Sequence, residues 1–167
     1  RARGLLRGHH GIETDLARAE LAEVVRLGRR VDVLERELRA LVGPDDPLLA
    51  IAGLGVISAA VIRGEAGEVS RFASSDAFAM FAGIAPLPAS SGRTSRVRYN
   101  RHGNRRINRA FWTIAVWQAK FDPRARAYLA RKREEGKSWR EALRCLKRQL
   151  VRPVFAALLA GHQPAAL

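Results

Sequence analysis

Apolar residues alternate at spacings of three and four through the first part of the chain, between Val24 and Leu41. This heptad spacing keeps apolar side chains on one stripe of a helix, so it predicts one long helix, roughly Ile12 to Leu41. The stripe breaks toward the N-terminus, where Glu13 and Glu20 fall on it. Gly43-Pro44-Asp45-Asp46-Pro47 then ends the helix. The stripe consists of Val24, Leu27, Val31, Leu34, Leu38 and Leu41.

This long helix has two interpretations. Its stripe could pack on the chain's own domain, or it could be a coiled-coil arm that pairs with a second helix. We favour the arm, and therefore expect a homo-oligomer formed through this helix. The predicted organisation is a coiled-coil arm over residues 1–43, followed by one helical domain over residues 44–167. The chain starts at Arg1 inside a helical pattern rather than at Met, so we expect it to be the C-terminal part of a longer protein.

A second apolar stretch, Leu48 to Ile62, is interrupted by Gly53-Leu54-Gly55. Two short apolar helices around such a turn form a helix-hairpin-helix. Its glycines allow the tight turn and a close approach of the backbone, and the amides that open the second helix can donate to phosphate. The same pattern also occurs as a purely structural turn. Because an arginine run follows, we predict that Gly53 and Gly55 contact the DNA backbone.

The rest of the chain is also predicted to be mainly α-helical. The residues Gly64–Phe72 predict a connector, and Ser74 or Ser75 can cap a short helix. A loop is predicted over Ala89–Gly103, with at most a brief extended piece. Three further helices are predicted: from Asn104 to about Lys120, from Pro123 to Gly136, and beyond a capping box at Ser138–Glu141. Their predicted buried residues are Ile107, Phe111, Ile114 and Trp117, then Leu143, Leu146, Leu150, Val154 and Leu158.

The charge of the chain indicates a polyanionic partner. The 167 residues carry a formal net charge of +14, and no acidic residue lies between Asp76 and Asp122. Such an excess is typical of nucleic-acid-binding proteins, and guanidinium groups bind phosphate in a bidentate manner. DNA is therefore the expected partner. The acid-free stretch contains Arg93, Arg96, Arg98, Arg101, Arg105, Arg106 and Arg109.

Other classes fit less well. No apolar run approaches the roughly 18 residues of a membrane span, and the basic stretches lack the apolar face of an interfacial helix. No signal-peptide pattern is visible. The single cysteine, Cys145, cannot form an internal disulfide and lies on an apolar helix face, so we expect it in the core of a protein from a reducing compartment. The expected location is the cytoplasm, in association with the nucleoid.

No metal site is predicted in this chain. His9 and His10 are adjacent, His102 is isolated, and no carboxylates have a spacing that would converge on Mg²⁺. Asp45-Asp46 is expected to be a solvated linker pair that caps a helix. The remaining candidate chemistry is the turn Ser90-Ser91-Gly92, just before the arginine run. From the residues alone, this is either an ordinary turn or a serine nucleophile aimed at phosphorus.

Five motifs in order resemble a known family. They are Gly53-Leu-Gly55, Glu65–Phe72, Phe81–Pro86, Ser91-Gly92-Arg93 and Gly103–Phe111. Together, over about Pro47 to Leu159, they resemble the C-terminal transposase domain of insertion-sequence transposases. These are bridge-RNA-guided recombinases that pair an N-terminal RuvC-like DEDD domain with a serine-bearing domain.

The resemblance implies a mechanism. A serine of this domain would attack DNA and form a covalent intermediate, while Mg²⁺ would be held by the DEDD domain and no cofactor by this part of the chain. By position the nucleophile is Ser91, with Ser90 as the alternate. Arg93 stands where the family usually has a lysine, which keeps the charge but changes the geometry. A guide RNA is a further partner that the resemblance allows.

We therefore expect a DNA transposase fragment that is inactive alone. Arg93, Arg96 and Arg98 would stabilise charge at the scissile phosphate. The DNA backbone would be held by Arg101, Arg105, Arg106 and Arg109. The alternative is a non-catalytic helix-hairpin-helix module that binds nucleic acid through the same residues, and a third possibility is a dimerisation fragment.

Overall fold

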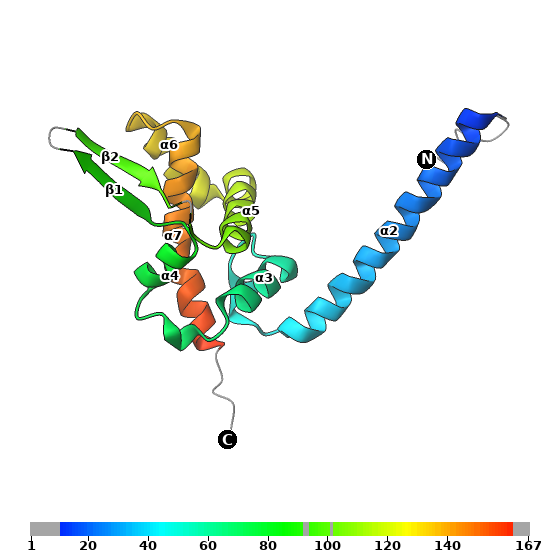
Figure 1. The fold of residues 1–167 in the computed structure, drawn as a ribbon, viewed down its shortest axis with the longest axis horizontal. Helices are drawn as coiled ribbons and strands as arrows, with labels where there is room; N and C mark the ends of the chain where they lie inside the picture. The colour runs from blue at the N-terminus through cyan, green and yellow to red at the C-terminus, as the bar shows by residue number, and fades with distance from the viewer. Residues whose placement is uncertain (1–10, 92–93, 101, 162–167) are drawn as a thin grey trace, which may run out of the picture. The chain divides into compact units, whose positions relative to one another are not determined.

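The computed structural model describes residues 11–91, 94–100 and 102–161. Internal contacts divide the chain into one unit that ends at Leu41 and a second that begins at Val42. Element labels follow Figure 1. The described residues are mostly helical, which confirms the mainly α fold class.

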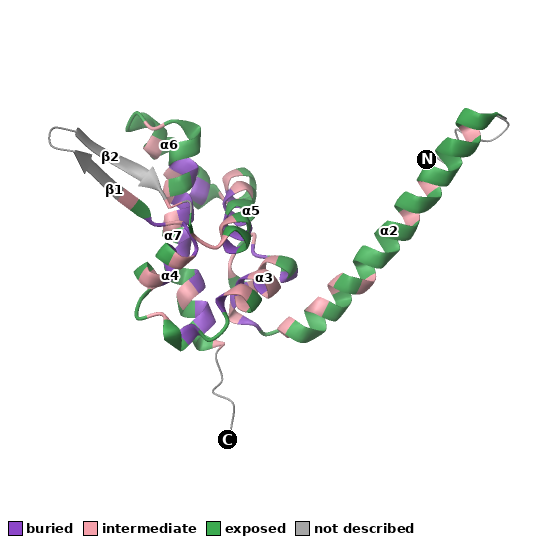
Figure 2. Ribbon diagram, viewed as in Figure 1, coloured by how far each residue is buried: buried purple, intermediate pink, exposed green. Residues whose placement is uncertain are grey.

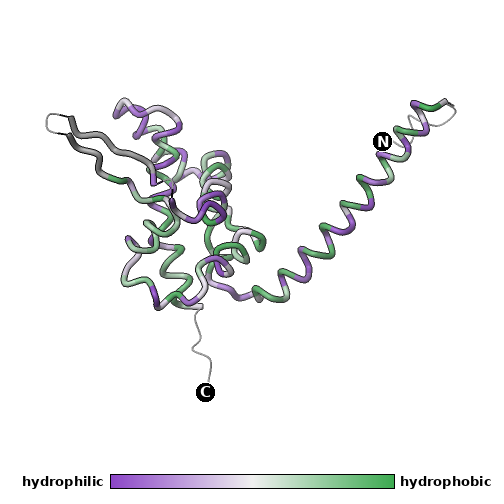
Figure 3. The backbone as a smooth tube through the Cα atoms, in the orientation of Figure 1, coloured by the Kyte–Doolittle hydropathy of each residue, from purple (hydrophilic) through white to green (hydrophobic). Residues whose placement is uncertain are grey.

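The first unit is a single helix, α2 (Ile12–Val42). None of its residues is buried, and its tube in Figure 3 alternates between apolar and polar positions along its length. The seam residues therefore stay open to solvent in the isolated chain, with Leu27 and Val31 each 49% exposed. The predicted helix is thus present, while its pairing with a second helix stays a prediction.

The second unit opens differently from the predicted helix-hairpin-helix. The segment before the glycine turn is only a four-residue 3-10 helix, η1 (Pro47–Ala50), and an α-helix appears only after the turn, α3 (Val56–Ala66). Pro47 and the side chain of Asp46, which accepts from the Leu48 amide, define this short turn. The structure therefore does not establish a helix-hairpin-helix with two α-helices.

Asp46 caps a helix as the sequence predicts, but the expectation that it is solvated is wrong. Its side chain is buried, and Oδ2 accepts from Nε of Arg63 at 2.5 Å. The ion pair ties the start of the second unit to α3. Gly64 and Glu65, predicted to lie in a connector, belong to α3, which continues to Ala66 before Gly67 adopts a φ of 61°.

Two short elements and a hairpin follow. The 3-10 helix η2 (Val69–Arg71) leads to α4 (Ser75–Phe81), which Ser74 caps as expected by accepting from the Ala77 amide. The predicted long loop is instead largely an antiparallel hairpin, β1 (Pro86–Ser91) and β2 (Thr94–Tyr99). β-branched and aromatic residues in β2 favour the extended backbone. Figure 1 shows the hairpin extending away from the helices.

Three helices complete the unit: α5 (Arg105–Phe121), α6 (Pro123–Glu134) and α7 (Trp139–Ala160). Each begins with a side-chain cap, and the capping box of α7 is the predicted one. Asn104 accepts from two amides of α5, Asp122 accepts from the Arg124 amide, and Ser138 with Glu141 forms a capping box.

The core lies where α3, α4, α5, α6 and α7 meet, shown as the purple segments in Figure 2. Phe78 is fully buried and contacts the rings of Phe72, Phe111 and Phe155 at centroid distances of 5.3, 6.3 and 5.8 Å. The predicted apolar faces of α5 and α7 are buried here, with one exception. Trp117 is 42% exposed, and its ring contacts Phe121 at 5.1 Å instead of entering the core.

No described helix is long and apolar enough to cross a membrane.

Candidate nucleic-acid interface

The hairpin carries the predicted nucleophile. In the strand register Ser91 stands opposite Thr94 and Ser90 opposite Ser95. Arg96 and Arg98 stand opposite Ala89 and Leu87. The predicted residues Arg93 and Arg101 lie outside the described residues.

A glycine contact fixes the base of this hairpin. A Cβ on Gly103 would lie 2.2 Å from the Cα of Gly83. This clash is with a backbone atom, so no side-chain movement can relieve it. Gly83 itself has a φ of 67°, which also favours glycine. The segment after β2 is therefore pressed against the end of α4, and only glycine permits the approach.

Three asparagines hold the same junction. Nδ2 of Asn100 donates to the Met80 carbonyl at 2.9 Å, and Nδ2 of Asn108 donates to the Ala82 and Gly83 carbonyls at 3.1 and 2.8 Å. The backbone amide of Asn104 donates to the Phe81 carbonyl at 2.7 Å. These bonds join the carbonyls of residues 80–83, at and just beyond the end of α4, to the segment that leads into α5. The motif Gly103–Phe111 thus forms a clamp between α4 and α5.

The clamp extends to α3 through Glu65. One of its carboxylate oxygens accepts from Nδ2 of Asn104 at 2.7 Å, and the other accepts from Nη1 of Arg106 at 2.9 Å. The Asn104 hydrogen bond and then the Arg106 guanidinium lower the pKa of Glu65 below its usual value. Arg106, predicted to bind the DNA backbone, is therefore paired within the protein, although its side chain is 80% exposed.

The two predicted glycines behave differently. Gly53 has a φ of 79°, and a Cβ there would lie 2.6 Å from Cε3 of Trp117. Its immediate role is close packing under that indole. Gly55 is the N-cap residue of α3, where no side chain caps the helix and a Cβ would meet nothing within 4 Å. The α3 amides behind Gly55 are therefore the better candidates for a phosphate.

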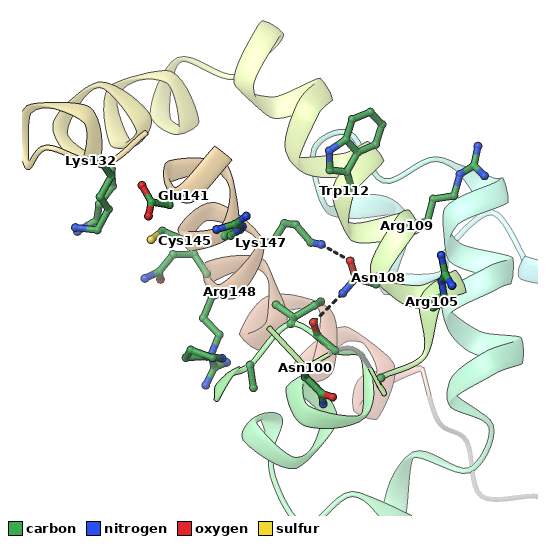
Figure 4. A pocket seen from close by; sticks show the side chains of 18 of the residues that line it. Asn100, Arg105, Asn108, Arg109, Trp112, Lys132, Glu141, Cys145, Lys147 and Arg148 are labelled. Carbon is green, nitrogen blue, oxygen red and sulfur yellow. Dashed lines mark hydrogen bonds between the residues drawn. The ribbon is translucent and has the colours of Figure 1, made fainter. Parts of the chain in front are cut away.

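A pocket of about 980 Å³ opens beside the clamp, between α5, the α6–α7 region and the start of the hairpin. Arg105 and Arg109, both predicted to hold DNA, line it, and among the described residues neither forms an ion pair. Figure 4 shows them on α5 together with Asn108 and Trp112. The structure thus brings these two arginines to one recess.

Sequence reasoning missed Lys147, which lines the same pocket from α7. Lys147 is only 9% exposed, and its Nζ donates to Oδ1 of Asn108 at 2.5 Å (Figure 4). Burial, and then the nearby charge of Arg144, lower the pKa of its ammonium to about 8. A signal existed, because Lys147 lies four residues after Leu143 on the apolar face of the predicted helix. Cys145, predicted to be core, is only half-buried and also lines the pocket.

No group of three histidine, cysteine or carboxylate side chains that could hold a metal ion occurs within the residues that the structure describes.

Comparison with known proteins gives the family. Residues 45–130, from η1 through the hairpin and α5 into α6, match the profile described as "Transposase IS116/IS110/IS902 family". The chain belongs to this family. The resemblance seen in the sequence is confirmed at that level, and the match includes both the hairpin and the clamp.

The curated relatives are proteins of insertion elements. The chain is 37% identical over 113 residues to the "Insertion element IS900 uncharacterized 42 kDa protein" of Mycobacterium paratuberculosis, covering 66% of the chain and 28% of the relative. It is 36% identical over 132 residues to the "Insertion element IS110 uncharacterized 43.6 kDa protein" of Streptomyces coelicolor, covering 77% and 33%. The corresponding protein of IS116 from Streptomyces clavuligerus is 30% identical over 140 residues, covering 81% and 35%. The chain thus spans about a third of the relatives it matches.

Proposed function

We propose that this member of the IS116/IS110/IS902 family binds DNA and supplies the serine nucleophile for strand cleavage and rejoining in transposition. The observation that carries the proposal is the family match over residues 45–130, a region that contains Ser91 and the arginine run. The net charge of +14 supports a nucleic-acid partner independently.

The reaction is a transesterification. The Ser91 hydroxyl oxygen forms a bond to phosphorus while one P–O bond of the DNA strand breaks, and the serine proton passes to the departing DNA oxygen. The phosphoserine link retains the energy of the phosphodiester bond that was broken. A new DNA hydroxyl can then attack this phosphorus, which rejoins the strands and releases the serine. Ser91 is the proposed nucleophile because it matches the family's serine by position, and Ser90 is the alternate.

Charge stabilisation comes from the arginines of the hairpin. Negative charge accumulates on the phosphate oxygens in the transition state, and fixed cations there lower the barrier. Arg93, Arg96 and Arg98 have this role in the proposal. In the proposal, the DNA backbone is contacted by Arg101, Arg105 and Arg109 and by the backbone amides that follow Gly55 at the start of α3. In the proposal, Mg²⁺ is held by a RuvC-like DEDD domain outside this chain.

The test is to trap the covalent product. In a polypeptide that joins this chain to a RuvC-like DEDD domain, Ser91→Ala should abolish the protein–DNA adduct on a denaturing gel. Binding of duplex DNA should change little, since one neutral hydrogen bond contributes only about 0.5–1.5 kcal/mol. Ser90→Ala is the matched control and should keep the adduct.

Two results would contradict the proposal. An adduct that persists in Ser91→Ala and vanishes in Ser90→Ala would move the nucleophile by one residue. An adduct that survives both substitutions would exclude serine catalysis in this hairpin. The non-catalytic alternative predicts duplex binding with no adduct from the parent protein.

A further inference from the structure

The ammonium of Lys147 is not explained by the proposed chemistry. It is nine-tenths buried, its hydrogen-bond partner Asn108 is neutral, and among the described residues it forms no ion pair. A buried charge without a counter-charge is unfavourable unless a ligand supplies one. An ammonium has three protons to donate. Asn108 accepts one of them, and the same amide is fixed by its bonds to the Ala82 and Gly83 carbonyls.

The surrounding pocket is suited to an anion. Arg105 and Arg109 stand on the α5 wall without an ion pair among the described residues. The one carboxylate that lines the pocket, Glu141, is held in the capping box by the amide and hydroxyl of Ser138. The net field in the recess is therefore positive, and phosphate is the anion that such amino and guanidinium groups bind.

The remaining walls are apolar and aromatic. Ile84, Ala85 and Pro86 come from the start of the hairpin, and Trp112 comes from α5 with 51% of its surface exposed. Exposed aromatic rings beside cations are the usual arrangement for an unpaired strand, whose bases stack on the rings. A duplex presents its phosphates on a convex surface with its bases already stacked, so it is poorly shaped to reach the recessed Lys147.

We infer that this pocket binds a short stretch of unpaired nucleic acid, with Lys147 donating to a phosphate and Trp112 stacking on a base. The inference rests on the proposed nucleic-acid function of the chain and assigns it a second site, separate from the serine hairpin. Strand cleavage and exchange release unpaired ends, so Lys147 and Trp112 would hold a strand, while Arg105 and Arg109 on the α5 wall also contact the backbone of the duplex.

The experiment measures binding of three fluorescein-labelled probes by anisotropy: oligodeoxythymidylate, its RNA counterpart oligouridylate, and a duplex DNA of mixed sequence. Lys147→Met removes the charge and keeps the aliphatic stem. We expect it to weaken oligodeoxythymidylate binding by about tenfold or more, the effect of losing a buried charged hydrogen bond. The matched control is Lys120→Met, an exposed lysine of α5 that does not line the pocket. It should change affinity by less than about twofold.

A second variant does not depend on the buried lysine. Trp112→Ala alters an exposed side chain and should leave the thermal melting temperature unchanged. It should weaken binding of the unpaired probe by about tenfold, because stacking is lost. If Lys147→Met melts below the assay temperature, Trp112→Ala decides the question. Equal losses for the DNA and RNA probes would support a site that takes either strand. A loss for only one of these two probes would identify the source of the strand.

Equal affinities of Lys147→Met and Lys120→Met for the unpaired probes, with no effect of Trp112→Ala, would overturn the inference. So would an equal loss of duplex and single-strand binding. Either result leaves the proposed function intact if the parent still binds duplex and Ser91 still forms the adduct. If the parent chain binds none of the three probes, both the inference and the proposed function are refuted.

Discussion

At the scale of single residues, the polar side chains around α5 determine where the hairpin starts. Asn100, Asn104 and Asn108 all bond to the end of α4 or to Glu65, and together they place the backbone that leads into β1 and out of β2. Asparagine suits this position because its amide both donates and accepts. The segments that lead into and out of the hairpin are thus joined to α4 and α3 by hydrogen bonds.

Gly103→Ala tests how strongly this junction depends on backbone contact. The added methyl group would meet the backbone of Gly83, so we expect a loss of about 1–3 kcal/mol or more in the free energy of unfolding. Urea denaturation followed by circular dichroism would measure it.

Gly64→Ala is the matched control for that substitution. Gly64 lies inside α3 with nothing within 4 Å of an added Cβ, so alanine should stabilise the chain by roughly 0.5–1 kcal/mol. Wild-type stability of Gly103→Ala would show that the two backbones can separate without cost, contrary to the structure.

Lys147 belongs to the same scale and shows where sequence reasoning stops. The apolar stripe of α7 is predicted correctly, with Leu146, Leu150 and Val154 buried. Lys147 lies four residues after Leu143 beside this stripe, but lysine is seldom buried, so the spacing alone does not predict its burial. Only the neighbouring helix, with Asn108 in reach, shows that this lysine turns inward.

At the scale of elements, local signals predict most helices and miss the strands. Side-chain caps at Ser74, Asn104, Asp122 and Ser138 fix the helix starts, since each is a local interaction that the sequence displays. The hairpin is predicted as a loop because its prolines and serines suit turns as well as edge strands. The position of the hairpin also depends on residues outside its own sequence, including the contact of Gly103 with Gly83.

The predicted first helix of the helix-hairpin-helix fails for a related reason. Leu48–Ala50 is apolar enough for a helix, but Pro47 and the Asp46 cap allow only one 3-10 turn before Gly53. Tertiary contacts then complete the turn, with the Ala52 carbonyl accepting from Nε2 of Gln118 at 2.7 Å. Composition alone does not reveal that bond.

The element that invites a further test is α2. Five of its six seam residues are exposed and Leu38 is half-buried, and apolar residues left in water on a heptad spacing favour pairing. Leu34→Asp combined with Leu38→Asp should abolish self-association, because each buried carboxylate would cost a few kcal/mol. Sedimentation equilibrium of parent and variant would measure the change.

The control for the arm places the same residue type away from the seam. Arg29→Asp with Arg36→Asp alters two positions on the opposite side of the heptad and should leave the oligomeric state unchanged. A parent chain that remains monomeric at high concentration would refute the arm as a dimerisation element.

At the scale of the whole molecule, the net charge bears on the proposed binding of DNA. The excess of 30 lysines and arginines over 16 acidic residues attracts any polyanion, and contacts to phosphate release counterions from the duplex. The family match and the charge both support the proposed DNA partner. Local ion pairs decide which cations remain available to it.

Duplex affinity should therefore fall steeply with salt, with a log–log slope of about −0.9 for each phosphate neutralised. Arg105→Ala and Arg109→Ala should each make the slope less negative by about 0.9, since neither arginine is paired among the described residues.

Arg106→Ala is the internal comparison. Glu65 already compensates its charge, so the slope should change less. Fluorescence anisotropy at a series of salt concentrations would measure all four slopes. A flat dependence in the parent chain would contradict phosphate binding, and equal changes for the three arginines would show that the Glu65 pair opens when DNA binds.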